Sequence, residues 1–265
     1  MINKIFALCD MEFKRIYKVY FLGILTLIAM NIILFVNRVS NWINLISSNL
    51  NLKPSIKVLK NEIAVNYKYL FDEIIGTTSI ILAFFVLISL IYGVIIWYKD
   101  FSSKNKIAFT LYLLPQNRMN IFFSKLIVVV SLIYSFIIIQ IGCWFFEINI
   151  INELLGKDIY NFFDIQSLQP FVLSNSRDFF MIDTVGVVCA VLVIFMCTII
   201  SMAYKKVALI VYPVIIYFSM FFYFLGFGVI QDDMNIFLVH IAYFIFLITL
   251  SLTVSSKLLK DKINF

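Results

Sequence analysis

Charge is scarce in this sequence. Only 14% of its 265 residues are Asp, Glu, Lys or Arg, whereas 63% are hydrophobic and the mean hydropathy is +1.00. A soluble globular domain has about a quarter charged and about half apolar residues. The composition therefore places the chain in a lipid bilayer and predicts an all-α, polytopic membrane protein.

The residues that build metal and catalytic sites are also few. The chain has one histidine, His240, and four cysteines without CxxC spacing, at Cys9, Cys143, Cys189 and Cys197. A zinc site needs a fuller Cys/His set, so we expect structural thiols and no metal site. Because no second histidine or carboxylate pair accompanies His240, a packed or interfacial histidine is expected rather than a catalytic one.

A phosphate-binding loop of the GxxxxGK[ST] type is absent from the whole sequence. The chain is therefore not expected to hydrolyse ATP itself, and any work it does must draw on a partner or a gradient. The net charge of +6 does not indicate nucleic acid, because the basic residues cluster at the ends of apolar runs. At those positions, basic residues set membrane topology.

Long apolar runs are what the sequence does have. Six of them approach the roughly twenty residues that a helix needs to cross a bilayer, at 19–36, 74–97, 126–146, 184–202, 207–230 and 236–254. No repeat or linker divides the chain, so we predict one transmembrane domain over 1–265. In the two long connections outside the cell, 37–73 and 147–183, we expect short helices at the membrane surface.

Lys and Arg are distributed unevenly among the connecting segments. With the N-terminus inside the cell, fourteen of the 21 lie in inner segments and seven in outer ones. The positive-inside rule then predicts that both termini are cytoplasmic.

The first 18 residues have a helical pattern of their own. Ile5, Phe13 and Ile16 belong to an apolar stripe at steps of three or four, whereas Lys14 and Arg15 fall on the opposite side. This predicts an amphipathic helix over 1–18 that lies in the membrane interface. A signal peptide is disfavoured, because the next apolar run is too long and further spans follow.

Strongly polar side chains are rare inside the predicted spans. The amides Asn31 and Gln140 are the main ones, and Pro213 is the only proline in a span. An isolated amide in a span more often bonds across helices than binds cargo. Secondary transporters often use charged or broken-helix sites near the midplane, so this scarcity disfavours a gradient-driven carrier.

The connection between the second and third runs, residues 99–118, is basic at first, then apolar, and is interrupted by a proline. The pattern predicts a short helix from about Ser103, the expected N-cap, to Leu114. Its features are an apolar stripe, flanking lysines and a stop signal, at Ile107, Leu111, Leu114, Lys104, Lys106 and Pro115. Two interpretations stay open: a helix that docks a soluble partner, or a charged connector whose apolar residues dip into the interface.

The stretch WYKDFSSKNKIAFTLYLLPQNRMNIFFSKL resembles the segment after the second span of ABC-2-type transporter permeases. That family has an acidic residue, a short helix and an LLP…R…K ending, which match Asp100, Leu113, Leu114, Pro115, Arg118, Ser124 and Lys125. The N-terminal ALCDMEFKRIYK is similar to the family's interfacial connecting helix. The phenylalanine-rich spans and long first outer loop are more similar to the small permeases of Gram-positive bacteria that export phenol-soluble modulins or confer lantibiotic immunity.

The resemblance implies an exporter subunit in a bacterial plasma membrane, with amphipathic peptides or lipid-like molecules as cargo. It implies two cytoplasmic ATP-binding subunits, which hold ATP and Mg, and a second copy of this chain or a similar permease. It also assigns ATPase coupling to the 99–118 loop, at Asp100, Ser103, Lys104, Lys106, Ile107, Leu111, Leu114, Pro115 and Arg118. The interfacial helix would add Ile5, Phe13, Lys14 and Ile16 to the docking surface. No cofactor is expected in the chain itself, and its remaining partner is membrane lipid.

A second hypothesis comes from a different class of protein. A non-transporting immunity or sensor protein would bind a toxin through its outer loops and need no ATPase. The two are distinguished by whether a P-loop ATPase is encoded beside this chain.

Overall fold

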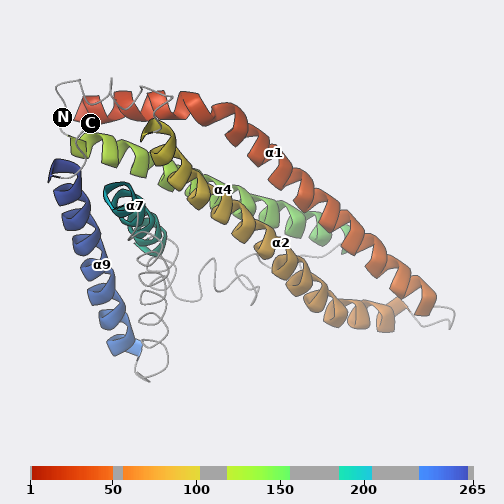
Figure 1. The fold of residues 1–265 in the computed structure, drawn as a ribbon. Helices are drawn as coiled ribbons and strands as arrows, with labels where there is room; N and C mark the ends of the chain where they lie inside the picture. The colour runs from red at the N-terminus through yellow and green to blue at the C-terminus, as the bar shows by residue number, and fades with distance from the viewer. Residues whose placement is uncertain (1, 50–55, 102–117, 156–184, 205–232, 262–265) are drawn as a thin grey trace. The chain divides into compact units, whose positions relative to one another are not determined.

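The computed structural model describes residues 2–49, 56–101, 118–155, 185–204 and 233–261 (Figure 1). These ranges contain five α-helices and no strand: α1 (Ile2–Asn49), α2 (Ile56–Phe101), α4 (Arg118–Leu155), α7 (Val187–Ala203) and α9 (Asp233–Asp261). The prediction of an all-α fold is confirmed for the described residues.

The helices are long because nothing in their sequences interrupts the backbone hydrogen bonds. None of the four prolines lies within a described helix, and proline is the residue that most strongly breaks one. The expected interfacial helix and the first span are therefore one uninterrupted helix, α1. The 37–73 connection also differs from the expected short helices, since α1 continues to Asn49 and α2 begins at Ile56.

Four of the described helices are long and apolar enough to cross a membrane, over Lys4–Asn41, Ile74–Asp100, Arg118–Glu153 and Ile241–Lys260. They contain all or most of the expected spans at 19–36, 74–97, 126–146 and 236–254. The expected span at 184–202 falls mostly on α7, an apolar helix of 17 residues. The expected span at 207–230 lies outside the described residues.

Most of the apolar surface of these helices faces outward. Only 17% to 33% of each spanning window is buried inside the protein. Large side chains such as Ile80, Ile138 and Phe146 are more than 65% exposed. Water does not tolerate so continuous an apolar surface, whereas lipid does. The structure is that of a membrane protein.

Contacts divide the chain into two compact units, to both of which α1, α2 and α4 contribute residues. The first consists of Met1–Ile16, Ile88–Leu132 and Ser176–Phe265. Its core holds three rings, Trp97, Phe122 and Phe195, from α2, α4 and α7, and all three are fully buried. Their centroids lie 5.6 to 6.1 Å apart. A Cβ at Gly93 would lie 3.2 Å from the Phe195 ring, so the glycine allows the two helices to approach closely.

Helix α9 packs against α7 in the same unit (Figure 1). Cys189 of α7 and Phe244 of α9 form the centre of this contact, with Val185 and Ile241 beside them. The Cys189 thiol also lies 3.9 Å from the carbonyl oxygen of Phe244. All four cysteines are free thiols, and Cys9, Cys189 and Cys197 are buried.

The second unit consists of Tyr17–Leu87 and Ile133–Asn175. Leu27, Leu82, Phe85 and Phe136 form its apolar core, from α1, α2 and α4. Gly23 lies against this core, where an added Cβ would be 3.3 Å from the Phe136 ring. Dispersion contacts between helices matter here, because apolar side chains gain little from leaving lipid for a protein core.

Two polar contacts join the helices of this unit. The Asn31 and Gln140 amides exchange two hydrogen bonds, of 2.9 and 2.8 Å, and both side chains are buried. One helical turn along α4, the Trp144 indole N–H donates to the Thr78 hydroxyl at 2.8 Å. The interpretation that the intramembrane amides bond across helices is confirmed. Farther along α4, the Glu147 carboxyl is also buried, and its Oε2 accepts no hydrogen bond from the described part of the chain.

The amide pair gives a first prediction. Asn31→Leu lowers the free energy of unfolding by about 1–2 kcal/mol, because it leaves the buried Gln140 amide without its hydrogen-bond partner. Asn31→Leu combined with Gln140→Leu costs less than the sum of the single changes, since no amide is left unpaired. Unfolding of the reconstituted protein by a denaturing detergent measures all three variants. Thr26→Val on the exposed side of α1 is the control, and strictly additive single effects contradict the pairing.

Candidate functional site: a buried charge cluster

Four charged side chains meet in the first unit at the ends of three helices. Glu12 and Arg15 come from α1, Asp100 from the end of α2 and Lys125 from the second turn of α4. Glu12, Asp100 and Lys125 are only 1–2% exposed, and the Arg15 side chain is 27% exposed. Charged side chains are almost never so deeply buried unless they are paired.

Lys125 lies between the two carboxylates. Its ammonium group donates to Oε1 of Glu12 at 3.0 Å and to Oδ2 of Asp100. Because Glu12, Asp100 and Lys125 belong to three different helices, one side chain ties all three together. The Lys125 Nζ also lies 5.5 Å from the centre of the Trp97 ring, whose face attracts a cation.

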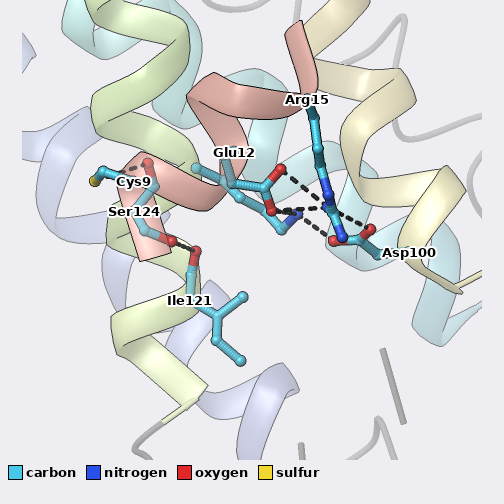
Figure 2. Close-up of polar contacts among 7 residues, drawn as sticks. Cys9, Glu12, Arg15, Asp100, Ile121 and Ser124 are labelled. Atoms are coloured by element: carbon cyan, nitrogen blue, oxygen red, sulfur yellow. Dashed lines mark hydrogen bonds and ion pairs between the residues drawn. The ribbon is translucent and has the colours of Figure 1, made fainter. Parts of the chain in front are cut away.

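Arg15 closes the cluster from its more exposed side. Its Nη1 donates to both Glu12 oxygens, at 3.2 and 3.1 Å, and to Oδ1 of Asp100 at 3.2 Å. Figure 2 shows the Arg15 guanidinium and the two carboxylates turned toward one another from α1 and α2. Two cations and two anions leave the cluster with no net charge, which is the condition for burying so many ionic groups at once.

Apolar and polar contacts hold the same helix ends together beside the cluster. Leu8 of α1 packs against Ile121 of α4, and Met11 covers both. The Cys9 thiol lies 3.6 Å from the backbone carbonyl of Ser124 (Figure 2). The first turns of α1 therefore lie directly on the first turns of α4.

Arg118 makes a second connection at this end of the unit. Its Nη1 donates to the backbone carbonyl of Leu259, 2.5 Å away in the last turns of α9. That carbonyl is near the helix C-terminus, where cations bind favourably. The 102–117 segment is thus preceded by the buried Asp100 and followed by Arg118, and each of these is held by a different helix.

The sequence-predicted coupling residues divide into two groups. Ser103, Lys104, Lys106, Ile107, Leu111, Leu114 and Pro115 lie outside the described residues. Asp100 is 2% exposed, so its carboxylate contacts the cluster and is closed to a soluble partner. Arg118 is half-buried against α9.

The predicted interfacial-helix residues lie on more than one side of α1. Ile16 is buried, Ile5 and Phe13 are half-buried, and Lys14 is exposed and pairs with Asp10 at 2.6 Å. The sequence pattern places Arg15 on the polar side of α1, and the residue is exposed there, while its guanidinium reaches Glu12 and Asp100.

Sequence reasoning did not identify the cluster. The sequence pattern places Arg15 and Lys125 among the charges that set membrane topology and assigns Glu12 no role, although Lys125 also matches the permease pattern. One signal was available: Glu12 lies between Cys9 and Ile16 at helical spacing, on the face that is buried. A charge within an apolar stripe indicates a buried ionic partner. The described residues contain no group of three or more side chains suited to hold a metal ion.

The cluster predicts an asymmetric response to neutralisation. Lys125→Met leaves two buried carboxylates with only Arg15, and it lowers the free energy of unfolding by about 3–5 kcal/mol. Adding Asp100→Asn restores part of that loss, because the remaining charges again sum to zero. Thermal unfolding in lipid nanodiscs measures both variants. Lys14→Met removes an exposed ion pair and costs under about 1 kcal/mol; equal losses from Lys125→Met and Lys14→Met contradict the cluster's role.

Comparison with known proteins adds no identification. No protein family, no curated protein and no solved structure matches this chain. A function for the chain therefore depends on its sequence patterns and on the geometry of the cluster.

Proposed function

We propose that this chain is the membrane-spanning permease subunit of an ATP-driven exporter of the ABC-2 type. It works in a bacterial plasma membrane, crosses that membrane six times and has both termini in the cytoplasm. A separate ATP-binding subunit, present in two copies, binds ATP and Mg and docks on the 99–118 loop. The membrane part is completed by a second copy of the chain or by a similar permease.

One observation carries the proposal: the residues on both sides of the 102–117 segment are fixed to the helix bundle. Asp100 pairs with Lys125 and Arg15, and Arg118 bonds to α9. Asp100, Arg118 and Lys125 are also positions at which the sequence resembles ABC-2 permeases. A merely solvated connector does not require buried ionic anchors beside it, whereas a segment that receives force does.

The anchors suggest how a docked subunit would act. Closure of two ATP-binding subunits pushes or turns the docked segment, and the segment passes this displacement to α2 through Asp100. Because Arg15 of α1 and Lys125 of α4 bind the same Asp100 carboxylate, α1 and α4 move with it. The motor shifts the balance between two permease states only if it binds one of them more tightly. Charge at Lys104, Lys106 and Arg118 sets the docking register more than the affinity.

The cargo proposed is an amphipathic peptide or another lipid-like molecule that moves outward. The described spans are mainly aliphatic and aromatic, and the amides Asn31 and Gln140 bond to each other across helices. A path lined in this way suits a cargo that enters from the bilayer rather than a small ion. Ion transport typically uses charged groups or broken helices near the midplane.

The docking surface is tested by introducing charge into it. Leu111→Asp with Leu114→Asp places two carboxylates on the predicted docking stripe, and buried unpaired charge disfavours binding. We expect the double variant to lose co-purification with the ATP-binding subunit encoded beside this chain. Transport of a fluorescent amphipathic peptide out of cells should fall with it.

A matched control is available in the first outer connection. Leu50→Asp with Leu52→Asp introduces the same two charges on the side of the membrane opposite the motor, and this control should leave the complex and transport intact. Thermal unfolding of each variant without the motor shows whether the fold has survived. A correctly folded double variant that still binds the motor and still exports excludes the 99–118 loop as the docking site.

A further inference from the structure

Exposed lysines gather at the same end of the first unit as the charge cluster. Lys4 and Lys14 of α1, Lys99 of α2, and Lys257 and Lys260 of α9 are all exposed. The cluster holds Lys99 next to α1, because Asp100 pairs with Arg15. The bond from Arg118 to Leu259 holds the last turns of α9 against α4. We refer to these five lysines as the basic collar.

No described carboxylate of this unit pairs with Lys4, Lys99, Lys257 or Lys260. Glu12 and Asp100 are occupied by Lys125 and Arg15, so the buried cluster is electrically balanced. Among the described side chains of this unit, Asp10 is the only exposed carboxylate, and it pairs with Lys14. Lys4, Lys99, Lys257 and Lys260 therefore present four positive charges that call for an external anion.

The position of the collar indicates which anion this is. Lys99 lies one residue before the end of the Ile74–Asp100 span, and Lys260 is the last residue of the Ile241–Lys260 span. Lysines at that depth reach the headgroup layer of a bilayer. Aromatic side chains at the same end are exposed as well, with Phe6 66%, Tyr98 47% and Tyr204 41% exposed. Tyr98 also joins α2 to α7 through a 2.5 Å hydrogen bond to Ser201. Exposed aromatics beside lysines are typical of a membrane–water interface.

We propose that the basic collar is a binding site for anionic phospholipid, whose headgroup phosphates the lysine ammonium groups contact. Bound lipid joins the ends of α1, α2 and α9 from outside, as Lys125 joins α1, α2 and α4 from within. The inference does not depend on the chain being an exporter, because the lipid would bind in the absence of any motor subunit.

The test uses the full chain alone, reconstituted in bilayers of phosphatidylcholine with a minor fraction of phosphatidylglycerol. Spin-labelled versions of the two lipids report how often each occupies the protein surface. We expect phosphatidylglycerol to be preferred by at least about five-fold, the factor that corresponds to one lysine–lipid contact of about 1 kcal/mol. High salt should reduce the preference, since exposed charges are screened.

Two variants of equal charge locate the site. Changing Lys4, Lys99, Lys257 and Lys260 to Gln should abolish the preference. Changing Lys53, Lys57, Lys60 and Lys68 to Gln, in the first outer connection, removes the same charge and should leave the preference intact. Arg at the same four positions of the collar, 4, 99, 257 and 260, should retain the preference, because the positive charge remains.

Several results overturn the proposal. If the wild-type protein shows no preference for the anionic lipid, the lipid site is ruled out, and no effect of a substitution on folding can explain that result. If both Gln variants lose the lipid preference to the same extent, the preference depends on the total charge of the protein and not on a site at the collar. A collar variant that keeps the lipid preference but no longer binds the ATP-binding subunit assigns the collar to an acidic protein surface instead.

Discussion

The burial of Lys125 between two carboxylates is the constraint on which the first unit depends. Glu12, Asp100 and Lys125 are almost fully inaccessible, and each comes from a different helix. An ammonium ion in an apolar interior is strongly unfavourable unless compensating groups surround it closely. The ends of α1, α2 and α4 must therefore stay together for the charges to be tolerated. Arg15 completes the balance and keeps one side of the cluster close to water.

The second unit uses a different kind of contact for a similar purpose. Amide pairing between Asn31 and Gln140, and the Trp144 bond to Thr78, connect helices that share an apolar core. Apolar side chains are nearly as stable in lipid as against each other, so they specify helix neighbours weakly. Directional polar bonds supply the missing specificity. Both units therefore rely on a few buried polar groups within a large apolar surface.

The membrane character and the helical fold could be predicted from the sequence, because apolar runs of about twenty residues have few alternatives in a bilayer. The sequence also predicted that the intramembrane amides bond across helices, although it did not predict that Asn31 and Gln140 bond to each other. The cluster was not, because helical spacing alone does not say which of Glu12 and Phe13 turns inward, and the structure buries Glu12 more deeply. Spacing along one helix carries no information about the Asp100 and Lys125 side chains that neutralise Glu12.

The cluster holds the start of α1 against the start of α4, and the closeness of these two helix ends can be measured directly. In a variant whose other cysteines are replaced, Ser124→Cys places a second thiol beside Cys9, which already contacts the Ser124 carbonyl. Mild oxidation in the reconstituted protein should join the two thiols efficiently. It should join them poorly when Lys125→Met is added, or when the new cysteine is placed by Ser131→Cys on the exposed side of α4. Cross-linking that is equally efficient with and without Lys125 would contradict the claim.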